Sequence, residues 1–259
     1  MLDYDKEADA YDATRGGEPR AAAAAEAVLG FVPQNARSLL DVACGTGIVT
    51  RRLAAARPGL RVTGLDAAPA MVRRAAARVP GSVLLADSRQ LPFPDGVFDA
   101  VTTVWLLHLV DGPQDARAII AECARVLRPG GVYITTVDKA AAHDVGSDID
   151  TVLAPRPRRP AQDSADQVRL HAAELGLRPV GTARFRGHGQ GRSPRSTAAD
   201  LRRGWFTMLP PGEPLNERFA AELELLPDQE VPRPDPEFTL LAFRKPTEGG
   251  GNQPAHSGN

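Results

Sequence analysis

The chain has 259 residues, 42% of them hydrophobic, and its 31 basic and 32 acidic side chains leave a net charge of −1. This length and composition can bury one large core, which favours a single main domain spanning residues 1–245. The balanced charge indicates no global field that would attract nucleic acid or an anionic membrane. No apolar run approaches the ~18 residues of a membrane span. Two cysteines, Cys44 and Cys123, and a start without a secretory signature predict a cytoplasmic protein in a reducing compartment.

Short apolar runs alternate with segments of helical period between residues 20 and 138. This alternation is typical of an α/β fold in which crossover helices join parallel strands. The predicted strands of this part span 38–43, 61–66, 82–87, 98–105 and 132–137. The predicted helices span 21–29, 46–56, 69–79 and 113–127. Pro129-Gly130-Gly131 is expected to end the last of these helices.

Beyond Asp138 the pattern loosens. A proline cluster makes residues 139–160 a predicted loop or partly helical lid, and residues 246–259 a predicted disordered tail. Further elements are predicted as a helix at 162–175 and strands from Arg178 and from Glu237. The segment between those strands far exceeds the ~2 to 5 residues of a hairpin loop. We therefore expect a substrate-side insertion at 189–235, with helices at 198–208 and 216–225.

Two glycines, Gly45 and Gly47, follow the strand at 38–43 in the segment LLDVACGTG. Glycine lets the backbone turn tightly and approach a ligand, and the following helix offers free N–H groups to a carboxylate or phosphate. The dinucleotide fingerprint requires a third glycine where this chain has Thr50. The turn alone therefore leaves the ligand open.

Two carboxylates narrow the choice to an adenosine cofactor. Asp66 ends the second strand 19 residues after Gly47, where a carboxylate can accept hydrogen bonds from both ribose hydroxyls. Asp87 closes the third strand at the same carboxyl edge, in position for the adenine amino group. Ligands of such sheets bind at that edge.

Four segments, in this order, resemble the class I S-adenosylmethionine-dependent methyltransferases and in particular their small-molecule branch: LLDVACGTG, VTGLDAAPAMVRRA, ADSRQLPFPDGVFDAV and ECARVLRPGG. The resemblance covers residues 1–138 and reaches the last two strands by pattern only. It implies a Rossmann-like seven-stranded sheet, mostly parallel with an antiparallel last strand and helices on both faces, and S-adenosyl-L-methionine as cofactor. Ala43 stands where the family often has glycine, which tightens the turn slightly. Abundant Ala, Arg and Pro favour a GC-rich source such as an actinobacterium.

The resemblance also implies a set of cofactor contacts. The methionine, ribose and adenine portions would lie in turn against Asp41, Ala43, Gly45, Gly47, Asp66, Ala67, Met71, Asp87, Ser88 and Val104. The segment DYDKEADAYDATRGG resembles the N-terminal element, residues 1–35, that closes over this cofactor in related enzymes. Its candidates are Tyr4, Tyr11 and Arg15, with Arg15 pairing with the cofactor carboxylate. A solvated amphipathic helix is the alternative interpretation.

His108 follows the strand at 98–105, where this family places residues facing the transferred methyl group. A histidine there is a candidate catalytic base, because its unperturbed pKa of about 6.5 suits neutral pH. The alternative is a histidine that only shapes the pocket, since methyl transfer needs in-line positioning and desolvation more than a base. Trp105, Trp205 and Phe206 are further candidate substrate contacts, although each also suits the core.

Other features predict neither a metal site nor a nucleic-acid partner. The remaining histidines are scattered without ligand spacing, so no metal is expected. Basic residues gather at 184–203 and acidic ones at 213–237, and such halves more often pair with each other than bind a charged partner. We expect a small-molecule substrate, no membrane contact, and a monomer or homodimer.

The sequence thus favours methyl transfer from S-adenosylmethionine to an oxygen, nitrogen or carbon atom of a small molecule, in secondary metabolism. Two alternatives keep the fold and the cofactor: a cyclisation without methyl transfer, and a module that senses the cofactor or serves a partner. Methylation of RNA is weaker still, because it would need a continuous basic surface.

Overall fold

The computed structural model describes residue 8 and residues 11–158, 160–204 and 209–247. Within these residues, seven strands form one sheet in the order β3-β2-β1-β4-β5-β7-β6. The strands are β1 (Ser38–Val42), β2 (Arg61–Asp66), β3 (Val83–Leu85), β4 (Phe98–Thr103), β5 (Leu127–Val137), β6 (Arg178–Arg186) and β7 (Glu237–Arg244). Strand β7 runs antiparallel to both of its neighbours, while the other pairs are parallel. The predicted Rossmann-like α/β fold is confirmed.

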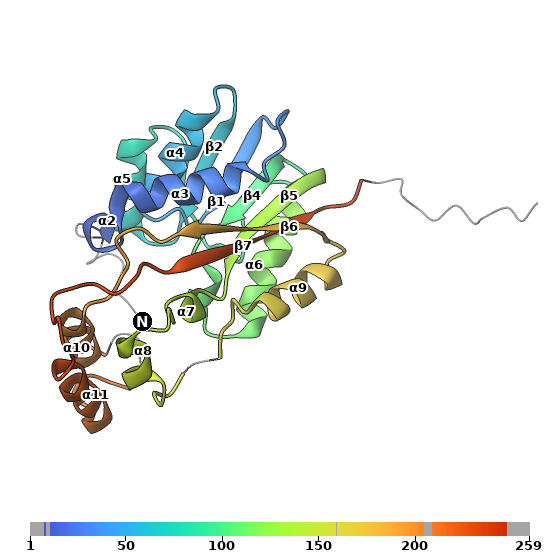
Figure 1. The fold of residues 1–259 in the computed structure, drawn as a ribbon. Helices are drawn as coiled ribbons and strands as arrows, with labels where there is room; N and C mark the ends of the chain where they lie inside the picture. Colours follow the sequence, from blue (N-terminus) through green and yellow to red (C-terminus); the bar gives the residue numbers. More distant parts are fainter. Residues whose placement is uncertain (1–7, 9–10, 159, 205–208, 248–259) are drawn as a thin grey trace, which may run out of the picture.

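Helices cover both faces of the sheet (Figure 1). The α-helices of the described residues are α2 (Tyr11–Thr14), α3 (Gly17–Leu29), α4 (Ile48–Ala56), α5 (Pro69–Arg78), α6 (Pro113–Val126), α7 (Lys139–Ala142), α8 (Asp148–Leu153), α9 (Ala165–Glu174), α10 (Pro194–Arg202) and α11 (Pro214–Glu224). Successive β1 residues point to opposite faces, so Leu39 packs with α3 and α4 while Leu40 packs with α6 and α9. The sheet is therefore buried between two apolar layers.

Most element boundaries agree with the sequence, and the largest departure is in β5. This strand begins at Leu127 and runs through Pro129-Gly130-Gly131, the segment that we expected to be a break. Gly130 N–H donates to the carbonyl of Lys245, and Lys245 N–H donates to that of Gly131. Helix α6 ends at Val126, close to the predicted end, but pairing with a segment more than a hundred residues away makes Pro129-Gly130-Gly131 part of a strand.

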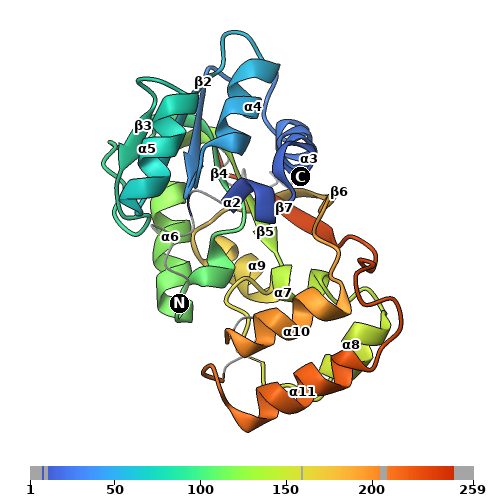
Figure 2. The same cartoon turned by 90° about the vertical axis from the view of Figure 1, so that its left-hand side faces the viewer.

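The two predicted insertions form one helical cap, which we define as α8, α10 and α11. Their apolar side chains make a small separate core of Ile149, Leu153, Ala198, Leu201, Phe219, Ala220 and Leu223. The cap lies beyond the end of the sheet at which β5 leads into α7 (Figure 2). Helix α10 begins at Pro194, earlier than predicted, because Ser193 and Ser196 form a capping box around its first turn.

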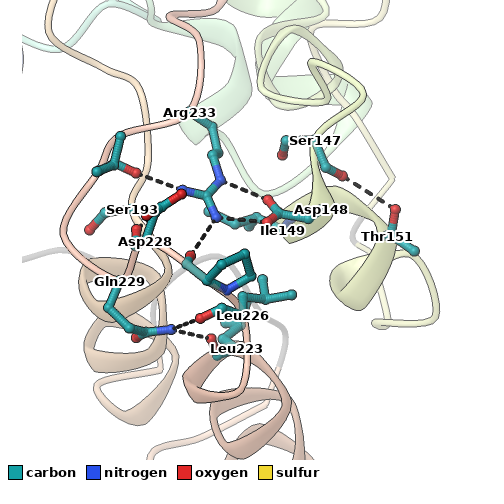
Figure 3. A network of polar contacts seen from close by, with 12 residues as sticks. Ser147, Asp148, Ile149, Thr151, Ser193, Leu223, Leu226, Asp228, Gln229 and Arg233 are labelled. Atoms are coloured by element: carbon teal, nitrogen blue, oxygen red, sulfur yellow. Dashed lines mark hydrogen bonds and ion pairs between the residues drawn. The ribbon is translucent and has the colours of Figure 1, made fainter.

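Arg233, in the loop before β7, connects separate segments of this cap by hydrogen bonds (Figure 3). Its Nε and Nη2 atoms donate to the carboxylate of Asp148 at 2.7 and 2.6 Å. The same guanidinium donates to the carbonyls of Pro227 and Val231 at 3.0 and 2.8 Å. One side chain therefore joins the start of α8 to the segment that follows α11.

Replacing Arg233 with methionine is expected to loosen the cap while the sheet stays intact. The cost is about 2 kcal/mol, because charge-assisted hydrogen bonds from a mostly buried side chain are lost. Hydrogen exchange should quicken in α8, α10 and α11 and stay unchanged in β1 and β4. Arg195→Met is the matched control: Arg195 is exposed and pairs with Glu230, so its loss should cost less than about 1 kcal/mol. Equal effects of the two replacements would contradict this role.

Candidate active site

A cavity of about 430 Å³ opens at the carboxyl ends of β1, β2 and β4. Small-molecule sites typically occupy about 300 to 1,000 Å³. Many of the residues that the sequence singled out line it: Tyr11, Asp41, Ala43, Gly45, Asp66, Ala67, Met71, Ser88, Val104 and Trp105. The strands that end here place these side chains around a single space, as expected for the carboxyl edge of a parallel sheet.

The glycine turn forms one wall of the cavity. Ala43, Gly45 and Gly47 all adopt positive φ angles, of 58°, 56° and 74°. Gly45 lines the cavity, and a Cβ atom added there would meet no described atom within 4 Å. Gly47 lies behind the turn, where an added Cβ would come within 2.8 Å of Ala75 in α5. Of the two glycines, Gly45 therefore leaves space for a ligand and Gly47 lets helix α4 pack against α5.

Asp66 connects β2 to this turn. Its Oδ2 atom accepts a hydrogen bond from Gly45 N–H at 2.8 Å, and its Oδ1 atom accepts one from Ala68 N–H at 2.9 Å. The carboxylate is only partly buried and faces the cavity. These two backbone bonds hold the carboxylate at the cavity wall, where it can accept a hydrogen bond from a ligand hydroxyl.

Asp41 is almost completely buried, with 2% of its surface exposed. Its Oδ2 atom accepts a hydrogen bond from the Thr50 hydroxyl at 2.7 Å. Burial raises the pKa of Asp41 to about 7, and the negative charge of Asp66 adds to this rise. Thr50, which stands in place of the third fingerprint glycine, thus provides a hydrogen bond to the buried Asp41, a role that the sequence did not reveal.

Asp41→Asn is expected to stabilise the ligand-free protein at alkaline pH. A carboxyl whose pKa is raised on folding favours the folded state fully only below its unfolded pKa, and that contribution is lost as pH rises through its folded pKa. For Asp41 this window runs from 3.8 to about 7. The variant should match the wild type near about pH 4 and have a higher Tm near about pH 8. Thermal melts across this range check the prediction, and a Tm difference independent of pH would contradict it.

The N-terminal element is docked on the glycine turn by Asp12. Its carboxylate accepts hydrogen bonds from the Thr46 hydroxyl at 2.7 Å and from the Arg78 guanidinium at 2.5 Å. This contact brings Tyr11 to the cavity wall. Arg15 lies between α2 and α3 and does not line the cavity, and Tyr4 lies outside the described residues.

Trp105 forms the opposite wall, beyond the end of β4. Its backbone has a positive φ of 59°, and its N–H donates to the Thr136 hydroxyl at 2.7 Å. The indole packs edge-on against Phe185 and Phe238. The Arg20 guanidinium lies 4.1 Å from the centre of the same ring. Trp105 is therefore fixed in place by aromatic and cation–π contacts.

Arg20 is a lining residue that the sequence analysis missed. Its side chain is buried, although it stands in an otherwise alanine-rich helix, α3. The sequence did contain a signal for it, because a single arginine in an apolar helix usually has a specific partner. Trp205 and Phe206, the other aromatic candidates, lie outside the described residues.

His108 lies in a short 3₁₀ helix, Leu107–Leu109, after β4. It is partly buried and is not among the cavity-lining residues. Burial lowers its pKa well below the usual value, and the positive charges of Lys139, His143 and Arg15 add to this effect. The imidazole is therefore neutral at physiological pH, and protonating it beside those charges is unfavourable.

Asp87 does not reach the cavity, although its neighbour Ser88 does. Its side chain is 48% exposed and forms an ion pair with Arg89 at 2.8 Å. Hydrogen bonds from Arg89 lower the pKa of this carboxyl. The structure thus brings together most of the predicted cofactor set but leaves Asp87 in an ion pair at the surface.

In the described part of the chain, no three His, Cys, Asp or Glu side chains gather in a way that could hold a metal ion. No helix there is long and apolar enough to cross a membrane.

Comparison with known proteins identifies the central domain. Residues 40–135 match the family described as a methyltransferase domain. The chain is 39% identical over 99 residues to a ubiquinone/menaquinone biosynthesis C-methyltransferase of Desulfotalea psychrophila, covering 37% of this chain and 39% of that protein. It is 34% identical over 157 residues to a ubiquinone biosynthesis O-methyltransferase of Xanthomonas oryzae pv. oryzae, covering 55% and 64%. The chain thus spans about two fifths to two thirds of the length of these curated relatives.

Two solved structures share the fold over almost the whole chain. The [4+2]-cyclase SpnF has a TM-score of 0.59 at 22% identity and covers 94% of both chains. A geranyl diphosphate C-methyltransferase of Streptomyces coelicolor has a TM-score of 0.53 at 18% identity, covering 95% of this chain and 85% of the other. The strand order of the sheet and the glycine turn are consistent with the methyltransferase domain matched at residues 40–135. Residues 40–135 therefore form a methyltransferase domain, whose cofactor is S-adenosyl-L-methionine.

Proposed function

We propose that the protein transfers the methyl group of S-adenosylmethionine to an oxygen, nitrogen or carbon atom of a small molecule. The observation that carries this proposal is the cavity at the carboxyl edge of the sheet, with the glycine turn and Asp66 on one side and Trp105 on the other. The residues present fit the cofactor, because Gly45 leaves open space at the turn and the Asp66 carboxylate, a hydrogen-bond acceptor, lines the same cavity.

In this proposal the cofactor lies along the glycine turn. Asp66 accepts hydrogen bonds from the ribose hydroxyls, with Ala67 beside them. Met71 and Ser88 contact the adenine, while Asp87 contributes little because it pairs with Arg89. The methionine portion lies against the remaining predicted set of Asp41, Ala43, Gly45, Gly47 and Val104, with Tyr11, Arg15 and Tyr4 from the N-terminal element closing over it.

When bound, the cofactor supplies an electrophilic methyl group on a sulfonium, which a nucleophile displaces in line. The chain contributes position and a dry environment: Trp105 is fixed by its ring contacts, and the N-terminal element is docked by Asp12. The depressed pKa of His108 makes it a weak base. Its proposed role is therefore to accept a hydrogen bond from the nucleophile and orient it, and to take up the proton only transiently.

The acceptor is proposed to enter between the N-terminal element, the region of His108, and the helical cap. The helical cap derives from the segments 139–160 and 189–235, and Trp205 and Phe206 belong to the second of these. We further propose one methyltransferase domain over residues 1–245, a monomer or homodimer in the cytoplasm, a role in secondary metabolism, and no nucleic-acid partner.

Incubation with S-adenosylmethionine carrying an isotopically labelled methyl group, together with a panel of phenols, amines and enolisable acids, tests the proposal. Mass spectrometry should find a product that has gained one labelled methyl group, with an equal amount of S-adenosylhomocysteine. A product of unchanged mass would support the cyclisation alternative. Cofactor binding without any product from any acceptor class would favour a sensing or partner module.

A further inference from the structure

Three arginines, Arg15, Arg20 and Arg192, act electrostatically on Lys139, and we call these four residues the acceptor-side cations. They come from the α2–α3 junction, from α3, from the start of α7 and from the loop before α10. Burial lowers the pKa of Lys139 to about 8, and the charges of the three arginines all contribute to this fall. Segments far apart in sequence therefore direct positive charge at one region.

Negative charge is scarce beside two members of this group. No described carboxylate lies within 4.0 Å of the charged nitrogens of Arg20 or Lys139. Asp163 acts on Lys139 from a distance, and its Oδ2 atom already accepts a hydrogen bond from the Lys139 backbone N–H. Asp12 acts on Arg20, but its carboxylate is held by Thr46 and Arg78.

Arg20 supplies an independent observation. Its side chain is 4% exposed and lines the cavity, with the guanidinium over the Trp105 ring. Its side chain is hydrogen-bonded to Tyr11, but among the described residues its Nε atom has no hydrogen-bond partner. A buried cation with an unused donor is costly, and such groups are normally paired with an anion.

We propose that the acceptor carries an anionic oxygen group, a carboxylate or a phosphate, that binds between Arg20 and Lys139. Such a group accepts charge-assisted hydrogen bonds from guanidinium and ammonium donors and compensates the clustered positive charge. It would hold one end of the acceptor while the nucleophilic atom faces the cofactor. Arg15 and Arg192 strengthen the local field without having to touch the group. This inference rests on the proposed methyl transfer and deepens it.

The test is calorimetric titration of the protein saturated with S-adenosylhomocysteine, so that the carboxylate subsite of the cofactor is filled. The probes are benzoate, phenyl phosphate and the neutral benzamide. At least one anionic probe should bind saturably, about tenfold or more tighter than benzamide. Lys139→Met and Arg20→Met should each weaken that binding about tenfold, the loss of one charge-assisted hydrogen bond.

Arg184→Met is the matched control, because Arg184 is exposed on β6 and pairs with Glu237; it should leave probe binding unchanged. Lys139→Met should also retain its affinity for S-adenosylhomocysteine. Absence of saturable anion binding, equal binding of benzamide, or anion binding unaffected by both replacements would overturn the inference. If Arg20→Met weakened the binding of S-adenosylhomocysteine but not that of the anionic probes, Arg20 would belong to the cofactor-binding site. The proposed anion site would then be wrong. Failure of S-adenosylhomocysteine itself to bind the wild type would instead overturn the proposed function.

Discussion

Replacing Asp66 with alanine is expected to weaken binding of S-adenosylhomocysteine about a hundredfold or more. The carboxylate is proposed to accept hydrogen bonds from two ribose hydroxyls, and each charge-assisted hydrogen bond contributes about 1.5 to 3 kcal/mol to the binding free energy. The same carboxylate holds the N–H groups of Gly45 and Ala68, so its loss also releases the glycine turn. Calorimetric titration of the wild type and variant measures the effect.

Two further variants separate these contributions. Asp66→Asn keeps the shape and one acceptor oxygen, so its affinity should lie between those of the wild type and Asp66→Ala. Asp87→Ala is the matched control, because Asp87 is an exposed carboxylate paired with Arg89 outside the cavity. Its affinity should change by less than about threefold, or less than 1 kcal/mol. A larger loss for Asp87→Ala than for Asp66→Ala would contradict the assignment.

The second large effect is expected from alanine at the two glycines of the turn. At Gly47 the added Cβ atom would lie 2.8 Å from the backbone of Ala75, and φ is 74°. Gly47→Ala should therefore destabilise the protein by about 2 to 4 kcal/mol, through left-handed strain and overpacking.

At Gly45 the added Cβ would meet no described atom within 4 Å, although φ is 56°. Gly45→Ala should cost only about 1 to 2 kcal/mol of stability. Because Gly45 lines the cavity, the methyl group of the new alanine should nevertheless weaken the binding of S-adenosylhomocysteine about tenfold or more. Denaturant melts and calorimetry on both variants separate stability from affinity. Identical profiles for the two variants would show that the positions do not have these distinct roles.

The positions of most strands and the edge of the sheet that carries the site were predictable because they depend on local signals. Apolar runs ended by Asp66 or by the glycine turn define where strands stop, and β2 has the predicted bounds. The start of β5 was not predictable, since Pro129-Gly130-Gly131 reads locally as a break. Its pairing with Lys245 depends on a segment that is distant in sequence.

In the candidate site, too, residues within motifs were predictable, whereas contacts between distant segments were not. Asp41, Gly45 and Asp66 lie within motifs, and the structure places all three on the cavity. Arg20 and Lys139 belong to no motif and lie more than a hundred residues apart, and only the folded chain places Arg20 near enough to act electrostatically on Lys139. No local pattern indicated this convergence.

Asp87 shows the converse. It occupies the expected position in its motif, but Arg89, two residues later, binds its carboxylate and holds it at the surface. A motif therefore fixes the position of a residue along the chain more securely than the direction of its side chain.

A crystal structure of the protein with S-adenosylhomocysteine tests the central claim most directly. The account predicts the ligand in the cavity, with its ribose hydroxyls on Asp66, its amino-acid portion along Gly45, and its sulfur facing the wall formed by Trp105. Ligand bound elsewhere on the chain, or in the cavity with its ribose away from Asp66, would contradict it.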